Sequence, residues 1–119
     1  MNKTITYPEL KEGELYSGIL LGEDGEPDHH VILLPNNAVN LTWDEAMKFA
    51  SDAGGDLPTR REQSLLFANI PDLRGCYWSN TQHSGESGSA WCQDFGHGYQ
   101  GWSFTGNKCR ARAVRRSVI

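Results

Sequence analysis

The chain has 119 residues, of which 38% are hydrophobic and 22% are charged, and its formal net charge is −4. This length and composition predict a single folded domain with one modest core rather than a disordered chain. The negative charge argues against a general nucleic-acid-binding protein, and no apolar run approaches the roughly 18 residues that a membrane span needs. The N-terminal stretch has no apolar core of the kind found in secretory signals, so we expect a cytoplasmic protein and no membrane partner.

The charges are unevenly distributed along the chain. Residues 9–28 carry seven acidic side chains, whereas the last twelve residues carry five basic side chains and no acidic one. Because opposite charges pair across neighbouring strands, we expect the two ends of the chain to meet in a sheet. We also expect framework ion pairs in which Arg60 or Arg112 binds Glu62 or Asp56. The alternative use of the arginines is a basic patch for phosphate or RNA.

The first part of the chain predicts an extended arm followed by a β-hairpin. Residues 1–13 form the arm, and residues 15–21 and 30–34 are expected to be strands. Asp24-Gly25 lies between them and is a strong hairpin signal. We expect Pro35-Asn36-Asn37 to end the second strand, since this sequence is typical of a turn.

Two helices are predicted next, and each begins with the same local motif. Thr42 with Glu45, and Thr59 with Glu62, have the spacing of a capping box, in which side chain and backbone satisfy each other at a helix start. Glycines at 54 and 55 are expected to end the first helix and Pro71 the second. Apolar residues then recur at helical spacing, so both helices are expected to bury one face.

From Cys76 onward the period changes from helical to alternating, which predicts short strands. In the last strand, Ala111 and Ala113 are expected to share one face while the arginines at 110 and 112 share the other. Trp78 and Trp91 lie in strand patterns, so we expect both in the core. The predicted strands are 76–82, 90–95, 102–108 and 109–116.

The three cysteines, Cys76, Cys92 and Cys109, indicate reduced thiols, because their number is odd and no secretory signal is present. Cys92 and Cys109 would lie close enough for a disulfide if their strands pair and the protein is oxidised. No Cys-x-x-Cys or Cys/His spacing points to zinc. We therefore expect neither a metal nor another cofactor.

Catalysis is not expected from the polar residues of this chain. Asp94 and His97 are spaced like part of a catalytic triad, but no nucleophile motif accompanies them. Glu86 and Asp94 are the only acidic residues in the loop region, too few for the six to eight oxygens that calcium takes. We therefore predict a protein that is not an enzyme.

The stretch from Asn80 to Trp102 is the best candidate for a contact surface, since it combines glycines with aromatic side chains. Tyr99 and Trp102 would be the anchors, because such rings offer large contact area with little loss of entropy. The alternative is that both rings simply complete a small core. The predicted contact residues are Asn80, Gln82, His83, Glu86, Gln93, Asp94, His97, Tyr99, Gln100 and Trp102.

Four short motifs occur in a fixed order along the chain: LPTR at 57–60 with Glu62, YWS at 77–79, AW at 90–91 and RAVR at 112–115. In this order they resemble a bacterial and phage family of C-type-lectin-like domains, from about residue 15 to residue 116. The resemblance implies an α+β fold in which two helices flank antiparallel sheets, with the termini close together. It also implies a long loop region that presents contact residues between positions 80 and 102.

The resemblance favours a non-catalytic recognition module, encoded by a phage or prophage, that binds a protein or a glycan. Such a module would act in receptor binding, in the host cytoplasm or on the virion. The calcium-binding tripeptides of sugar-binding relatives are absent from this sequence. The second hypothesis is an inhibitor of a host defence enzyme, whose acidic segment 9–28 would mimic nucleic acid. The oligomeric state, including a homo-oligomer, stays open.

Overall fold

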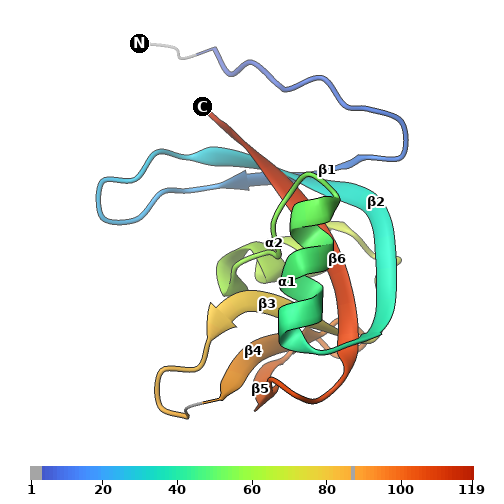
Figure 1. Ribbon diagram of the computed structural model, residues 1–119. Helices are drawn as coiled ribbons and strands as arrows, with labels where there is room; N and C mark the ends of the chain where they lie inside the picture. The colour runs from blue at the N-terminus through green and yellow to red at the C-terminus, as the bar shows by residue number, and fades with distance from the viewer. Residues whose placement is uncertain (1–3, 87) are drawn as a thin grey trace.

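The chain folds into two helices and one six-stranded mixed sheet within residues 4–86 and 88–119, which the computed structural model describes (Figure 1). It therefore has an α+β fold. Neither helix is long and apolar enough to cross a membrane in this described part. In chain order the elements are β1 (Leu15–Leu20), β2 (His29–Leu41), α1 (Trp43–Asp52), α2 (Arg60–Asn69), β3 (Cys76–Gln82), β4 (Ser89–Asp94), β5 (Gln100–Phe104) and β6 (Cys109–Val118).

The strand order in the sheet is β1-β2-β6-β3-β4-β5, so the last strand of the chain lies near the centre. Four of the five neighbouring pairs are antiparallel. β3 and β6 are parallel and meet at a single residue pair, Tyr77 with Arg110. The expectation of antiparallel pairing throughout is therefore wrong at this point, where the β1–β2–β6 part of the sheet joins the β3–β4–β5 part.

The two helices cover opposite faces of the sheet. Ala113 packs in a cluster with Trp78 and with Ala46 of α1, whereas the next residue, Val114, packs in a second cluster with Leu66 of α2. Successive side chains of a strand point to opposite faces, so these two clusters lie on the two sides of β6. We call the two sides the α1 face and the α2 face. Residues 111 and 113 are fully buried on the α1 face, as predicted.

Both capping boxes are present, which confirms the predicted helix starts. The Glu45 amide donates to Thr42 Oγ1 over 3.3 Å, and the Thr42 amide donates to Glu45 Oε1 over 2.9 Å. In α2 the corresponding distances between Thr59 and Glu62 are 3.1 and 2.8 Å. After α1 the chain turns at Gly54, whose φ of +90° is accessible to glycine with little strain.

The second strand is longer than predicted. β2 continues through Pro35-Asn36-Asn37 and pairs with β6 as far as Leu41. The pairing register shifts between Leu33 and Asn37, which accommodates a proline that cannot donate a ladder hydrogen bond. The turn predicted at these residues is therefore wrong, because pairing with β6 keeps the segment extended.

The predicted hairpin is confirmed, since β1 and β2 pair as antiparallel neighbours on either side of Asp24-Gly25. In Figure 1 its loop projects from the body of the molecule. The preceding residues, from Thr4 to Leu10, form neither helix nor strand, and the Thr6 carbonyl accepts a hydrogen bond from His30 Nε2 at 3.0 Å. Positions 1–3 of the predicted arm lie outside the described residues.

Candidate functional site

The sheet divides the predicted contact residues between its two faces. Trp91 pairs directly with Trp102 across β4 and β5, and Gln93 pairs with Gln100. These pairs lie on the α2 face, because Arg60 of α2 contacts Trp91 and Gln100 there. Asp94 is next to Gln93 in β4 and therefore belongs to the opposite, α1 face, near His97 and Tyr99. The predicted residues thus form two separate surfaces.

Four rings gather on the α2 face at the outer end of the sheet, and we call this group the aromatic ridge: His83, Trp91, Trp102 and Phe104. The His83 ring lies 4.9 Å from that of Trp91 and 5.3 Å from that of Trp102, measured between centroids. Trp102 and Phe104 are 6.2 Å apart and nearly perpendicular, at 76°. Phe104 was not among the predicted contact residues, although it follows Trp102 by two positions and so shares its face.

Trp91 is not a core residue, which corrects the sequence-based prediction. It is half-buried, and the guanidinium carbon of Arg60 lies 3.5 Å from its ring centroid, a cation–π contact. Its neighbours Ala90 and Cys92 face the core on the α1 side, so alternation directs Trp91 to the α2 face, where it contacts Arg60. Trp78, in contrast, is fully buried as predicted.

A glutamine pair fixes the position of Arg60. Gln100 Nε2 donates to the Arg60 carbonyl at 2.6 Å and to Gln93 Oε1 at 2.9 Å, while Arg60 Nε donates to Gln100 Oε1 at 3.1 Å. Gln93 is 1% exposed, so it supports the surface from beneath and does not reach a partner. These bonds hold the guanidinium over the face of Trp91.

The outer part of the ridge is exposed to solvent. Trp102 is 44% and Phe104 59% exposed, and both belong to β5, the edge strand of the sheet. Large apolar side chains that stay exposed side by side mark an interaction surface more often than singly scattered ones. Trp102 does not complete the core, so the alternative raised for it from the sequence is wrong.

Three further predicted residues lie in the 80–86 stretch. Asn80 is half-buried, and its amide donates to the Pro58 carbonyl at 2.9 Å. Gln82 is exposed at the end of β3 opposite Ala90, so it belongs to the α1 face and not to the ridge. Glu86 is exposed in the loop that follows, and the next residue, Ser87, lies outside the described residues.

The second surface, on the α1 face, carries the predicted residues that are separated from the ridge. His97 Nδ1 lies 3.0 Å from Asp94 Oδ2, and the Asp94 carboxylate also accepts the amide of Gly96 at 2.7 Å. These hydrogen bonds, that of His97 first, lower the pKa of Asp94. The His97 ring stacks against Tyr99, which is 65% exposed. The aspartate therefore orders a turn.

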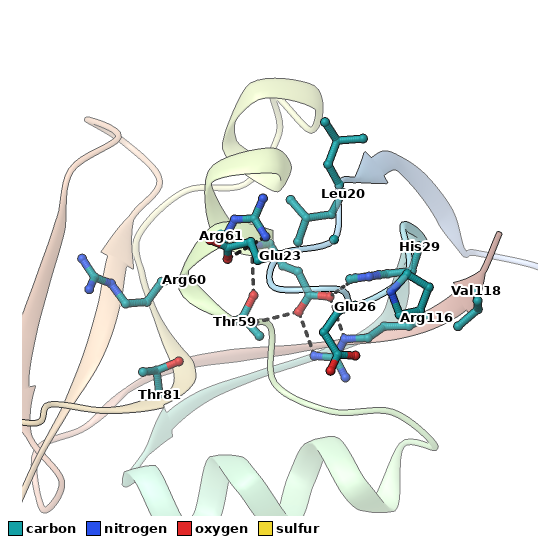
Figure 2. Close-up of a pocket in the computed structure, with 14 residues that line it drawn as sticks. Leu20, Glu23, Glu26, His29, Thr59, Arg60, Arg61, Thr81, Arg116 and Val118 are labelled. Carbon is teal, nitrogen blue, oxygen red and sulfur yellow. Dashed lines mark hydrogen bonds and ion pairs between the residues drawn. The ribbon is translucent and has the colours of Figure 1, made fainter.

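A cleft of about 500 Å³ lies beside the ridge, between the β1–β2 hairpin and the start of α2 (Figure 2). Arg61 at its rim forms an ion pair of 2.9 Å with Glu23 of the hairpin loop. Figure 2 shows Arg60 pointing away from the charged groups that line this cleft. Arg60 therefore separates the cleft from the aromatic ridge.

At the base of the cleft, Glu62 is fully buried, and both oxygens of its carboxylate are hydrogen-bonded. Arg116 donates to its two carboxylate oxygens at 2.6 and 2.7 Å, His29 Nε2 lies 2.9 Å away, and the Thr59 amide adds a fourth bond. Burial alone would raise the pKa of Glu62, but the hydrogen bonds from Arg116 and Thr59 outweigh it and lower the pKa. Because the Glu62 carboxylate already has these partners, the cluster fits a role in stabilising the fold.

The arginine partners predicted from the sequence are wrong. Arg116, and not Arg60 or Arg112, pairs with Glu62 and also with Asp56, at 3.1 Å. Arg112 instead donates two hydrogen bonds to the Leu34 carbonyl. The reason is position along β6, since residue 116 reaches α2 whereas residue 112 lies opposite the irregular part of β2.

The predicted pairing of acidic and basic ends is confirmed at one ion pair, although the two ends are not neighbouring strands, because β2 lies between β1 and β6. Arg115 of β6 donates to both carboxylate oxygens of Glu14, at 3.0 and 2.8 Å. These bonds, followed by that of the Lys11 amide, hold the pKa of Glu14 at about 2, below its usual value of 4.5.

The structure brings the three cysteines together, which spacing in the sequence did not reveal. Their sulfur atoms all lie within 4.8 Å of one another, and those of Cys76 and Cys109 are 4.0 Å apart. All three are free thiols, so the disulfide considered for Cys92 and Cys109 is not formed. Hydrogen bonds from Cys76 and then Cys92 lower the pKa of Cys109 to about 4. Only the register of β3 against β4 and β6 could have predicted this cluster.

Comparison with known proteins gives no match, either to a family model or to a curated protein. What the chain does must be inferred from the geometry of its own residues.

Proposed function

We propose that the protein is a non-catalytic recognition module that binds a protein partner through the aromatic ridge. The observation that carries the proposal is the exposure of Trp102 and Phe104 on an edge strand, beside an arginine held in place over Trp91. Tryptophan and arginine are the residue types that most often dominate the energy of an interface. The ridge unites both types at one place.

The ridge is also ordered before any partner arrives. Gln93 and Gln100 fix Arg60, and His83 packs against two indole rings, so few side chains would lose freedom on binding. Each rotamer-rich side chain that must be immobilised at an interface costs about 0.5–1.5 kcal/mol. A surface whose anchor side chains are already ordered therefore loses less entropy on binding, which increases its affinity.

The ring geometry favours a protein over a glycan. A sugar ring stacks on a flat aromatic face, whereas Trp102 and Phe104 stand at 76° to each other and leave a corner between them. Such a corner accepts an apolar side chain, whose contacts need no flat platform. The nearby Arg60 guanidinium would add a donor for a carboxylate or carbonyl of the partner.

We infer further that the fold is C-type-lectin-like and that the module is encoded by a phage or prophage. The support is the ordered set of motifs that ends in RAVR at 112–115, together with two helices that pack on a mostly antiparallel sheet. In this resemblance the contact stretch matches residues 80–102, which includes most of the ridge. A bacterial host protein is then the expected partner.

The experiment compares two exposed aromatic surfaces that the sheet separates. A host protein captured from bacterial surface and cytosolic fractions is purified, and its affinity for Trp102→Ala and Phe104→Ala variants is measured by calorimetry. We expect Trp102→Ala to weaken binding by about 30-fold or more, the loss typical of an interface anchor. Tyr99→Ala is the matched control, because Tyr99 is more exposed but lies on the other face.

Unchanged affinity in both ridge variants, with a loss in Tyr99→Ala, would move the contact to the α1 face and refute the ridge. The fraction that yields the partner tells a surface receptor from an intracellular target. Enzyme activity would contradict the proposal if it disappeared in a His97→Ala variant.

The acidic hairpin is the second candidate, favoured by its projection from the body of the molecule (Figure 1). Two of the seven acidic residues between positions 9 and 28 form ion pairs, Glu14 with Arg115 and Glu23 with Arg61. The remaining charge at the loop could still occupy a basic groove, as a mimic of nucleic acid. A variant with lysine at 23, 24 and 26 should keep full affinity if the ridge is the contact, and lose it if the hairpin is.

A further inference from the structure

The cysteine cluster lies on the α1 face, opposite the aromatic ridge, and is assembled from three strands. Trp78 pairs with Cys92 across β3 and β4, which places Cys76 diagonally beside Cys92 on the same face. Cys109 begins β6, whose next residue pairs with the residue after Cys76. The sheet register therefore directs three thiols to one point, although they are far apart along the chain.

The spacing of the sulfur atoms fits a metal ion and not a disulfide. A zinc–thiolate bond is about 2.3 Å long, so three sulfurs arranged as a triangle around one ion lie about 4.0 Å apart. The Cys76 and Cys109 sulfurs are 4.0 Å apart, and all three lie within 4.8 Å of one another. A disulfide would require about 2.05 Å. The three sulfur atoms would have to move only slightly towards one another to bind one ion.

We propose that Cys76, Cys92 and Cys109 bind one thiophilic metal ion, Zn(II) or Cu(I), through three sulfur ligands. Thiolates are soft ligands and select these ions over Mg²⁺ or Ca²⁺, which take oxygen. Binding replaces the thiol protons by the metal ion. The proposal is independent of the ridge and of any partner bound there.

The cluster is accessible, as a metal site must be. It borders a hollow of about 310 Å³ that is also lined by Asp94, Tyr99 and Ser103. Gly101 lies directly across from Cys92, and a Cβ at Gly101 would meet nothing within 4 Å, so the space beside the sulfurs is open. An ion can enter here, and a water can complete the four ligands that zinc prefers.

Charged residues of both signs lie near the cluster. A second hollow of about 200 Å³ borders Cys76 and Cys109 and is lined by Lys108 and Arg110. These two cations lie on β6 or directly before it, next to Cys109 in the chain. They would offset part of the excess negative charge of three thiolates around a monovalent or divalent ion, whereas Asp94 adds a carboxylate at the first hollow.

Ordinary packing of small apolar side chains is the competing explanation. Cysteine behaves as a small hydrophobe in many cores. Packing alone, however, does not require three sulfurs to converge, and Cys76 and Cys109 are only half-buried beside the two hollows. Three sulfur atoms that meet beside an open hollow are therefore better explained as metal ligands than as core packing.

The test uses the whole reduced protein under anaerobic conditions. Zn(II) and Cu(I) are titrated in separate arms against a chromogenic chelator, and we expect one ion per chain with a dissociation constant below about 1 μM. X-ray absorption of the loaded protein should then show three sulfur neighbours at about 2.3 Å. The arm with the tighter binding identifies the ion.

Cys76→Ser and Cys109→Ser are the test variants, since both positions are half-buried and tolerate the change better than the buried Cys92. Each should weaken binding by about 100-fold or more. Ser103→Ala, which lines the same hollow without offering sulfur, is the matched control and should bind normally. Circular dichroism confirms that each variant is folded, and the metal should raise the melting temperature of the wild type and of Ser103→Ala but not of the two serine variants.

Three results would overturn the proposal. The first is the absence of stoichiometric binding in both arms. The second is binding that persists in both serine variants. The third is a Cys76–Cys109 disulfide, detected by mass as the loss of two hydrogens, that forms in air while no metal binds under reducing conditions.

Discussion

The cluster around Glu62 and the aromatic ridge lie on the same face of one sheet and are separated by Arg60, yet they are built in opposite ways. Around Glu62, one carboxylate is fully buried, its charged neighbours are partly exposed, and each of these groups has a partner. On the ridge, apolar rings that could have been covered stay exposed. The contrast indicates that the cluster around Glu62 stabilises the fold, whereas the exposed rings of the ridge are available to a partner. Stability should therefore depend on the first region and affinity on the second.

Removing the charge of Glu62 should have the largest effect on stability. We expect Glu62→Gln to lower the free energy of unfolding by about 3 kcal/mol, since the fully buried side chain then loses its charge-assisted hydrogen bonds with Arg116. Glutamine can still complete the capping box, so the change isolates the charge. Urea unfolding measures the loss. Glu45→Gln, at the same capping-box position of α1 but exposed, is the control and should lose much less.

Arg60 joins the two regions, so its replacement should have an intermediate effect. We expect Arg60→Met to lower the free energy of unfolding by about 1 kcal/mol, because the cation–π contact with Trp91 and the hydrogen bond to Gln100 are lost. Methionine keeps an apolar side chain over the indole. A loss of more than about 3 kcal/mol would show that Arg60 belongs to the framework and not to the ridge.

The ion pair of Glu14 with Arg115, whose side chain is partly exposed to solvent, should contribute less, and only above acidic pH. The pKa of Glu14 is about 2 in the folded protein and near 4.5 when unfolded, so its stabilisation is full above pH 4.5 and is lost as the pH falls towards 2. We expect the wild type to exceed Glu14→Gln by less than about 1 kcal/mol at pH 6. At pH 2, where the carboxyl is half protonated in the folded protein, most of the difference should be gone; a gap as large as that at pH 6 would contradict this assignment.

The smallest stability effect is expected on the ridge itself. Phe104→Ala should change the free energy of unfolding by less than about 0.5 kcal/mol, because the ring is mostly exposed. Phe95→Ala is the matched comparison: its ring is 3% exposed on the same face, and its loss should cost about 3–5 kcal/mol. Equal losses at the two positions would mean that the ridge is part of the core.

Features that depend on neighbouring residues could be predicted from the sequence, whereas features that depend on strand pairing could not. The capping boxes at Thr42 and Thr59 involve only residues three apart, so the motif itself determines the helix starts. Pro35 in β2 was misread, because its turn preference yields to pairing with β6 through a register shift. The strand pattern around Trp91 was recognised, but which alternate residues face the core depends on where the helices pack.

The candidate site shows the same limit. The sequence placed Tyr99 and Trp102 on one surface because they are close in the chain. They are three residues apart around the β5 edge, and strand alternation sends their side chains to different faces. The cysteine cluster and the partner of Arg116 likewise depend on strand register, which cannot be predicted from a local sequence pattern.

The position of β6 has a consequence for how the molecule forms. This strand, Cys109–Val118, bridges β2 and β3 and so holds together two groups of strands that are made earlier in the chain. Its partners in β2 are far away in sequence, and closing such long loops is slow, typically on a scale of milliseconds to seconds. A chain still lacking β6 would have a hairpin, β1–β2, and a three-stranded unit, β3–β4–β5, with unpaired edges, and such edges invite association with other chains.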